Sequence, residues 1–453
     1  MLKQAERRLD LHPTVAWSRR GSLLILAIAL GVRLAIVFVT QSYLQVEHTE
    51  VVRVATSLAR QGTFANAYGP NTGATAHVSP FYPILLSLIF RGLGTGVVGE
   101  IAQEILSCLL ASLTYAALPA LGAACGLDPA VGTMAGMLGA LLPVNSWAET
   151  KGSFEAPLVG LMLVLFCVLL ARCWRSADFS LASALVTGLV SGLALLASPS
   201  LAPVVVASLL VGYWLIGRTT ARQYFQFAAI VIAASILCLT PWTIRNYLVL
   251  GAPVWSRSNF GNELFISNSD MAAANMRDNL DSGWFQTAHP FYSRIERKKL
   301  RAMGEVPYNR ARTKEATRWI IAHPEHFSRL TAQRIFYFWF PRMVRRPQTI
   351  LMAMFSVGGL AGLIWMFRAG YPVAWLFLAT FTTYPLVYYV VQSFPRYRCP
   401  VDWMLIFLTA FGICSVWTAA VSSRESGLAS ASDRVQIQSR NNYKRVCSPG
   451  QMP

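Results

Sequence analysis

The residues of this sequence that could do chemistry are carboxylates and arginines that stand close to long apolar runs. Glu47 and Glu50 follow the first such run, and Arg245 lies near the end of a later one. A carboxylate can deprotonate or orient an attacking nucleophile, and a planar guanidinium can bind two phosphate oxygens at once. Each of these residues could equally be a solvated or membrane-anchoring charge, and the residue types alone leave both interpretations open.

Two charged residues stand inside apolar runs. Arg33 interrupts the first run, and Glu155 lies near the start of another. A charge at that depth is costly in lipid, so each is expected to have a partner or to face a polar cavity. His77 is isolated in sequence, and the eight cysteines lack the spacing of a zinc site or a disulfide framework. No metal and no cofactor are therefore predicted.

The composition indicates a membrane protein. Of 453 residues, 54% are hydrophobic and only 13% are charged, whereas about 25% are charged in a typical soluble domain. The net charge of +18 is dispersed over short loops between apolar runs and one long polar segment, which the positive-inside rule and anionic headgroups explain. Membrane lipids are therefore expected partners, and nucleic acid is not.

The apolar runs predict an all-α polytopic membrane protein with about ten spans. Arginines in the short loops place both chain ends in the cytoplasm and two long segments outside. The predicted parts are an N-terminal transmembrane module (1–246) with an outer loop (41–97), an extracytoplasmic cap segment (247–348), C-terminal transmembrane helices (349–421) and a disordered cytoplasmic tail (422–453). The predicted spans lie near 22–40, 98–122, 130–145, 153–171, 181–197, 201–217, 227–246, 349–367, 373–392 and 402–421.

The two outer segments contain sequence that favours helices. Residues 48–61 place apolar side chains on one helical face, which predicts an amphipathic interfacial helix ended by Gly62. Residues 81–93 are apolar but too short to span, which predicts a second interfacial helix. In the cap segment, residues 309–320 are helix-compatible, and residues 328–346 combine aromatic and basic side chains typical of a helix at the headgroup level.

Three motifs, in order along the chain, carry a resemblance to a known family. They are 50–58 (EVVRVATSL) with 70–83 (PNTGATAHVSPFYP), then 240–263 (TPWTIRNYLVLGAPVWSRSNFGNE), then 396–400 (RYRCP). Together they resemble the GT-C-type membrane glycosyltransferases, which include aminoarabinose lipid A transferases and protein O-mannosyltransferases. The sequence is most similar to bacterial family-39-like enzymes, over roughly residues 20–420.

The resemblance implies an inverting enzyme that transfers a sugar from a polyprenyl-phosphate-sugar donor to a lipid, glycan or protein acceptor. It assigns the catalytic carboxylate to Glu50, with Glu47 as the competitor because the wider superfamily has an acidic residue earlier. Donor phosphate would be bound by Arg245, Arg396 and Arg398. The residues expected around the substrate cavity are Arg33, His77, Tyr82, Glu155, Asn259 and Glu263.

Two other functions fit parts of the sequence. A lipid-linked glycan polymerase or ligase also works on the outer face and has a long outer loop late in the chain. A glycolipid transporter or flippase would place ionisable residues and broken helices near the membrane midplane, whereas most polar residues here lie outside the spans. The sequence favours a bacterial inner membrane with the site facing the periplasm, and it does not define the sugar or the acceptor.

Overall fold

Every named element among the described residues is a helix, as the apolar patterning predicts. The computed structural model describes residues 19–216, 220–342 and 346–421; the predicted tail 422–453 lies outside these residues. Within them, six helices are long and apolar enough to cross a membrane. These are Arg19–Thr40 (α2), Val97–Ala124 (Val97–Ala116, α5, with Leu118–Ala124, α6), Ala156–Ser176 (α9), Ala221–Leu250 (α12), Pro347–Arg368 (in Arg346–Arg368, α19) and Cys399–Val421.

The count of about ten spans is not confirmed. Four of the predicted spans correspond to shorter apolar helices of 10–17 residues, which at 1.5 Å per residue fall short of a hydrocarbon core of about 30 Å. Hydropathy averaged along the sequence does not show where these helices end. The shorter helices are Phe81–Leu93 (α4), Pro129–Leu141 (α7), Leu181–Ala197 (α10), Pro199–Leu215 (Pro199–Leu201, η2, with Ala202–Leu215, α11) and Ala374–Val390 (Ala374–Thr383, α20, with Leu386–Val390, α21).

Small residues allow the apolar helices to pack closely. Where α10 crosses α12, a Cβ added to Gly188 would stand 2.6 Å from the Ala234 Cβ, and one added to Gly192 would stand 2.5 Å from the Cys238 Cβ. Such contacts leave no room for a larger side chain, so the two backbones approach as they do in other membrane helix pairs. This packing fixes the direction in which α12 leads into the cap segment.

The first outer segment folds as its sequence predicts. It contains a short turn, Ser42–Leu44 (η1), then Glu50–Gln61 (α3) and α4. The Thr49 side chain accepts a hydrogen bond from the Val52 N–H at the start of α3, and Gly62 ends the helix with a φ of 69°, the left-handed conformation that glycine adopts freely. The predicted helices at 48–61 and 81–93 are therefore both present.

The cap segment is also helical. It comprises Phe260–Ser267 (α13), Met276–Asp281 (α14), Trp284–Ala288 (α15), Arg294–Met303 (α16), Glu305–Ala322 (α17) and Pro324–Trp339 (α18). The predicted helix at 309–320 lies within α17. The one predicted at 328–346 ends earlier, at Trp339, because Pro341 disfavours a helical conformation for Phe340.

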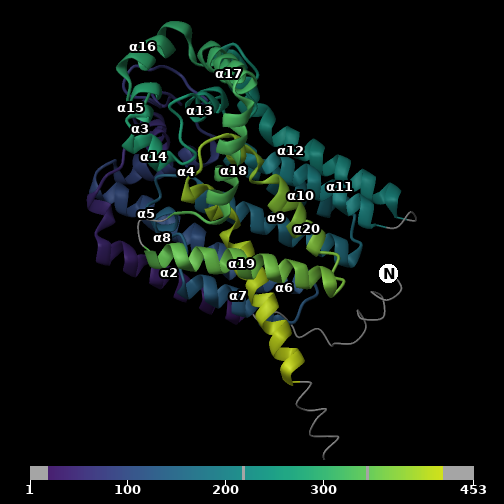
Figure 1. Cartoon of the computed structure of the whole chain (residues 1–453). Coiled ribbons are helices and arrows are strands. Elements are labelled where there is room, and N and C mark those ends of the chain that lie inside the picture. The colour runs from purple at the N-terminus through teal and green to yellow at the C-terminus, as the bar shows by residue number, and fades with distance from the viewer. Residues whose placement is uncertain (1–18, 217–219, 343–345, 422–453) are drawn as a thin grey trace, which may run out of the picture.

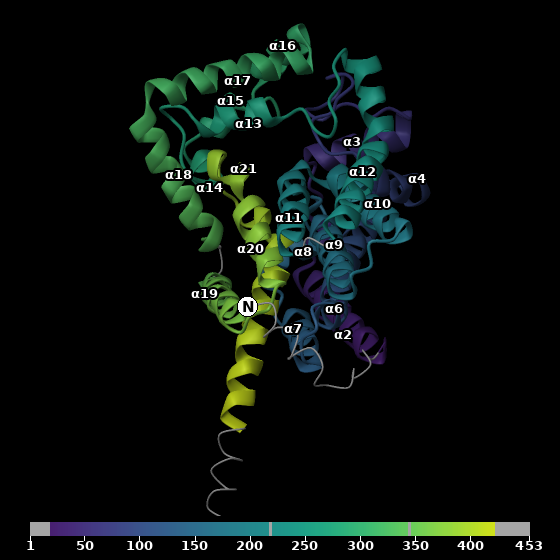
Figure 2. The same ribbon diagram turned by 90° about the vertical axis from the view of Figure 1, so that its right-hand side faces the viewer.

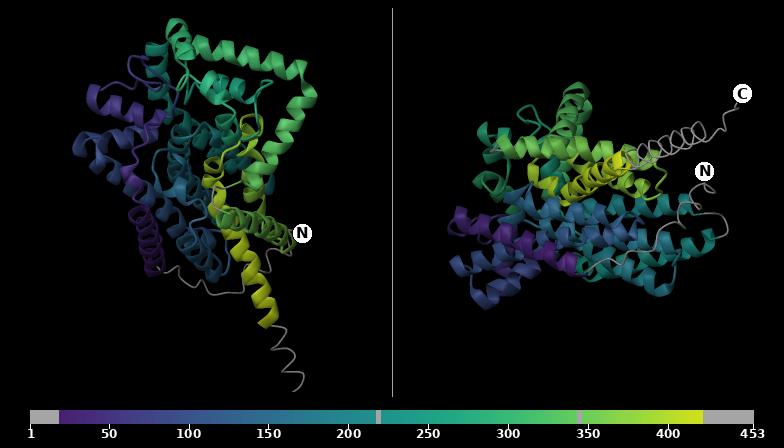
Figure 3. Two further views of the ribbon diagram at one scale, coloured as in Figure 1. Left: turned by 60° about the vertical axis from the view of Figure 1, so that its left-hand side comes forward. Right: turned by 90° about the horizontal axis from the view of Figure 1, so that it is seen from below.

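Both outer segments lie at one end of the molecule. Figure 1 places α3 and α13–α17 together at the top, and Figure 2 shows α16 and α17 above the ends of the apolar helices. The helix Cys399–Val421 runs toward the opposite end, as the left view of Figure 3 also shows. Residues far apart in sequence therefore meet at this end, and an active site built from both segments is geometrically possible.

Candidate active site

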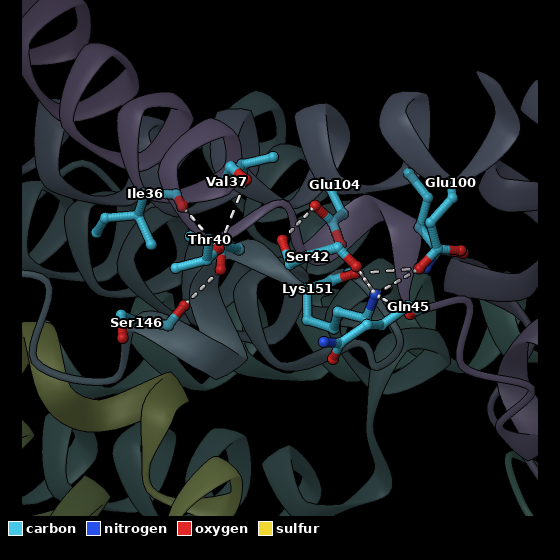
Figure 4. A network of polar contacts seen from close by, with 12 residues as sticks. Ile36, Val37, Thr40, Ser42, Gln45, Glu100, Glu104, Ser146 and Lys151 are labelled. Carbon is cyan, nitrogen blue, oxygen red and sulfur yellow. Dashed lines mark hydrogen bonds and ion pairs between the residues drawn. The ribbon is translucent and has the colours of Figure 1, made fainter. Parts of the chain in front are cut away.

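A buried lysine fixes the chain that leads into α3. The Lys151 ammonium lies 2.8 Å from Glu100 Oε1 and 3.0 Å from Glu104 Oε1, and it also donates to the carbonyl oxygens of Ser42 and Gln45 (Figure 4). Both carboxylates are almost fully buried. Because a buried charge needs a partner, this network holds residues 42–45 against α5 and sets the position from which α3 begins.

The loop between α3 and α4 is anchored from two other directions. Glu305, the first residue of α17, accepts hydrogen bonds from the Thr75 hydroxyl, from the Ala76 N–H at 2.7 Å and from the Ser258 hydroxyl at 2.6 Å. Burial raises the pKa of Glu305 above its ordinary 4.5, although these three donors and Arg245 act in the opposite direction. The cap segment thus holds the backbone next to His77.

Arg245 provides the other anchor. Its guanidinium donates at 2.8 Å to the carbonyl oxygens of Thr75 and Phe64, and it also donates to Asn246. Both terminal nitrogens are thus engaged with protein, and the guanidinium packs over the rings of Phe64 and Trp242. This geometry favours a structural role for Arg245 over the expected binding of the donor phosphate.

The anchored loop brings Glu50 and His77 together with His289, which comes from the cap segment. One ligand-type atom from each lies within 4.8 Å of the others. His77 Nδ1 shares a 2.6 Å hydrogen bond with the buried Tyr68 hydroxyl. Burial, followed by the charges of His289 and Arg257, lowers the pKa of His77 well below its ordinary 6.5, so its imidazole is neutral at pH 7.

The cluster has the ligand types of a divalent-cation site, a feature that sequence spacing did not reveal. One contact argues against it. The Phe291 N–H donates to His289 Nδ1 at 3.1 Å, so a neutral His289 carries its proton on Nε2. That nitrogen lies 3.7 Å from Glu263 Oε1 and is set to donate to a carboxylate rather than to bind a metal. As bonded here, the cluster does not fit a cation held by all three residues.

Arginines and carboxylates surround this cluster. Arg257 donates to the His77 carbonyl oxygen at 3.3 Å and pairs with Glu155 Oε1 at 3.1 Å. Burial raises the pKa of Glu263, but hydrogen bonding and charge from His289, with the charges of Arg257 and Arg396, outweigh burial and lower it. Glu263 is therefore ionised at neutral pH, and the positive charges converge on the centre of the site.

Arg396 and Arg398 have opposite surroundings although they are two residues apart. The Arg396 guanidinium stacks 3.6 Å from the ring centre of Phe154, and its one hydrogen bond among the described residues is a long one, 3.4 Å, to the Tyr397 hydroxyl. Burial lowers the pKa of Arg396, but Tyr397 and the carboxylates of Glu155 and Glu50 outweigh it and raise it. Its donors remain available to an anion beside Glu50.

Arg398 is instead fully engaged in the fold. It donates to Asp402 Oδ1 at 2.7 Å, to the Trp339 carbonyl oxygen at 2.8 Å and to the Met352 carbonyl oxygen at 3.1 Å, and it is 1% exposed. These bonds join the last outer turn to α18 and α19. Of the three arginines expected at the donor phosphate, only Arg396 has the geometry for that role.

The remaining expected cavity residues divide in the same way. Arg33 pairs with Glu149 at 2.7 Å and is 0% exposed, so the partner expected for it lies inside the helix bundle. Tyr82 is buried, and its hydroxyl donates to the Gly152 carbonyl oxygen at 2.7 Å. Neither is open to a substrate. Asn259 directly precedes α13 and is partly exposed, close in sequence to Arg257 and Glu263.

The two carboxylates considered for catalysis face different neighbours. Glu50 lies within electrostatic range of Arg53, Arg396 and Tyr292. Glu47 also acts on Tyr292, and it lies near the acidic side of the Lys151 network, where it acts on Glu100 and Glu104. Glu50 thus lies among the arginines of the candidate site, whereas Glu47 lies closer to the Lys151 network.

Sequence reasoning missed two residues of this site, His289 and Arg257. His289 stands in AHPFY, the only histidine of the stretch 247–322, and Arg257 lies within the matched motif 240–263. The motif was therefore a usable signal for Arg257. No spacing rule links His289 to Glu50, because 239 positions separate them in the chain and only the cap segment's fold brings them together.

No protein-family model matches this sequence, and no curated protein does. Solved structures do match. The apo form of the Archaeoglobus fulgidus oligosaccharyltransferase has 12% identity and a TM-score of 0.54, with 90% of this chain and 52% of that chain covered. The archaeal oligosaccharyltransferase AglB from Archaeoglobus fulgidus, in complex with an inhibitory peptide and a dolichol-phosphate, has 14% identity, a TM-score of 0.52 and coverages of 95% and 52%. This chain shares their fold.

The likeness is one of fold, and it agrees with the helical membrane enzyme that the resemblance to GT-C-type glycosyltransferases implies. The chain spans about half the length of the oligosaccharyltransferases it matches. At 12–14% identity, the likeness concerns the arrangement of the helices and not the activity. The narrower similarity to family-39-like enzymes stays a prediction. Together with its long apolar helices, the fold identifies an integral membrane protein.

Proposed function

We propose that this protein is a glycosyltransferase that moves a sugar from a polyprenyl-phosphate-sugar donor to a lipid, glycan or protein acceptor. The observation that carries the proposal is Arg396, a stacked guanidinium with nearly all its donors free, within electrostatic range of the carboxylates of Glu50 and Glu155. A phosphate leaving group and an acceptor nucleophile need such a cation and such a carboxylate side by side. The GT-C-type fold supports this reaction class.

In this proposal Glu50 accepts the proton of the acceptor nucleophile, or orients it, as the bond to the anomeric carbon forms. Arg396 stabilises the phosphate charge that develops as the sugar departs from its lipid carrier. Glu155 and Arg257 position each other through their ion pair, and Arg257 also fixes the His77 backbone. Attack from the face opposite the departing phosphate gives inversion at the anomeric carbon.

The test is sugar transfer by membranes that contain the full chain, with a pool of radiolabelled polyprenyl-phosphate-sugars as donors. Wild type is expected to consume one donor, and Glu50→Gln is expected to lose about 10²–10⁴-fold in rate while its abundance in the membrane stays normal. Glu47→Gln is the matched control, because Glu47 lies toward the Lys151 network. Inactivity of Glu47→Gln alone would move the base to that residue, and no donor consumption by any form would remove the proposed reaction.

We further propose that the site faces the outer side of a bacterial inner membrane. The arginines of the short loops support this orientation, and both outer segments gather at one end of the molecule. A cysteine introduced at exposed Arg294 should react with a membrane-impermeant maleimide in intact cells. Labelling only after cell lysis would reverse the orientation.

A further inference from the structure

A cavity lies beside α3, the helix that begins with Glu50. It has a volume of about 410 Å³ and is lined mainly by α3 and by the loop that follows α3. The charged or titratable residues that line it are His48, Arg53, Arg60 and Glu100. Glu100 and Glu104 share the single positive charge of Lys151, and the positive charge of the walls comes from Arg53 and Arg60.

A third arginine, Arg297 of the cap segment, lies close to two residues that line the cavity, Gly69 and Arg53. A Cβ placed on Gly69, which lines the cavity, would stand 3.3 Å from Arg53 Nη1 and 3.7 Å from Arg297 Nη1. The two guanidinium groups therefore converge on one point of the wall. Their like charges repel, and burial followed by the charge of Arg297 lowers the pKa of Arg53, although Glu50 acts in the opposite direction.

Protein contacts hold these two arginines in place without using their converging ends. Arg53 donates through Nε to the His48 carbonyl oxygen and stacks 4.2 Å from the ring centre of Phe291. Arg297 donates through Nε to Pro290 and through Nη2 to Phe291, in both cases to the carbonyl oxygen. No hydrogen bond among the described residues uses Nη1 of either arginine. Two fixed, unused donors that point at one spot are what an oxyanion needs.

The cavity lies close to Glu50 along α3. Glu50 and Arg53 are one helical turn apart on α3, so they lie on the same face. Tyr292 lies within electrostatic range of both, and of Arg396. A group bound at Arg53 and Arg297 would thus lie near Glu50, which is also within electrostatic range of Arg396.

We propose that Arg53 and Arg297 bind a phosphate-class oxyanion carried by the acceptor. The inference rests on the proposed function and names the acceptor's chemical class: an anionic molecule, held by its oxyanion beside Glu50 so that a nearby hydroxyl or oxygen can attack the donor sugar. The donor phosphate is assigned to Arg396, so the two anions bind to different arginines near Glu50. Arg60, whose guanidinium donates to the Thr95 hydroxyl, adds charge at the cavity mouth.

The probe is radiolabelled inorganic pyrophosphate, bound at equilibrium to the full chain in a neutral detergent. Arg53→Gln and Arg297→Gln are each expected to weaken binding at least about tenfold, the loss of one charge-assisted hydrogen bond. Arg294→Gln is the matched control, because Arg294 lies one turn earlier on α16 and is exposed. Equal binding by all four proteins would overturn the proposal.

Further measurements separate this site from the donor site, and one of them uses wild-type protein alone. Pyrophosphate should protect Arg53 and Arg297 of wild type from phenylglyoxal, mapped by mass spectrometry, even if the variants do not fold. Loss of binding in Arg396→Gln, or displacement by polyprenyl monophosphate, would overturn the assignment to the acceptor while leaving the glycosyltransferase proposal intact. Conversely, the site stands if it binds pyrophosphate while the transfer assay fails.

Competition with lipid vesicles distinguishes the two possible sources of the oxyanion, a lipid headgroup and a glycan or soluble acceptor. Phosphatidylcholine vesicles with phosphatidylglycerol should displace pyrophosphate if the natural ligand is a lipid headgroup, and vesicles of phosphatidylcholine alone should not. Retention of pyrophosphate in both cases assigns the oxyanion to a glycan or a soluble acceptor. Both outcomes keep the site at Arg53 and Arg297.

Discussion

The contrast between Arg396 and Arg398 gives the sharpest prediction. Arg398→Ala removes three hydrogen bonds, one of them from a fully buried ion pair with Asp402. Leaving that carboxylate without its partner costs about 3–5 kcal/mol, a large part of the roughly 5–15 kcal/mol that stabilises a folded protein. Arg398→Ala is therefore expected to lower the amount of folded protein severely.

Arg396→Ala removes mainly the stacking on Phe154, with one long hydrogen bond, a loss of about 0.5–2 kcal/mol. The fold should survive. The donor phosphate would lose one or more charge-assisted hydrogen bonds of about 1.5–3 kcal/mol each, so kcat/KM for the donor should fall at least about tenfold. Arg396→Lys keeps the positive charge but loses the planar guanidinium that can bind two phosphate oxygens, so its activity should lie between those of wild type and Arg396→Ala.

Two measurements on the same preparations decide the matter. Size-exclusion chromatography of fluorescently tagged protein gives the folded fraction, and the transfer assay gives kcat/KM per folded molecule. The reasoning fails if Arg396→Ala loses as much folded protein as Arg398→Ala. It also fails if Arg396→Ala folds normally and keeps the wild-type kcat/KM.

Three other perturbations follow from the structure. Transfer activity is expected to survive metal chelation, because the Phe291 N–H keeps the proton of a neutral His289 on Nε2. If activity is lost on chelation and recovered on adding Zn²⁺ or Mn²⁺, His289 is a metal ligand instead. Lys151→Met leaves two buried carboxylates without their cation, so the amount of folded protein should fall. Adding Glu100→Gln and Glu104→Gln should restore part of it. No recovery would mean that the network stabilises the fold through packing rather than charge. Because the pKa of Glu305 is raised in the folded protein, its contribution to stability is fully present below the pKa that it has in the unfolded chain, about 4.5, and declines as pH rises through the folded pKa. In thermal melts at a series of pH values, Glu305→Gln should lack that decline. A pH profile of Glu305→Gln identical to that of wild type would contradict this assignment.

Local patterns in the sequence were enough to predict the elements of the first outer segment. The apolar stripe and the glycine stop of 48–61 are properties of neighbouring residues, so α3 and its end at Gly62 could be placed without the fold. The number of spans could not, because hydropathy averages over the breaks that shorten α7, α10 and α11. Short apolar helices inside a bundle have the same composition as spans.

The site was predictable only in part for a related reason. The sequence shows that an arginine stands at an outer turn, but only its partners decide between structure and chemistry. Arg245 and Arg398 have their donors filled by backbone carbonyl oxygens, whereas Arg396 has nearly all of its donors free. Those carbonyl oxygens belong to distant segments, so no local rule could separate the three. His289 was missed for the same reason.

The bond set at Glu305 has a consequence for biosynthesis. Residues 1–246 carry Glu50, His77 and the anchor Arg245 and leave the ribosome first, yet the Thr75 hydroxyl and the Ala76 N–H meet their acceptor only when Glu305 emerges with α17. His289 also comes late. A nascent chain that has already inserted its first helices therefore lacks part of the candidate site, which is completed only after the cap segment has been synthesised and has docked.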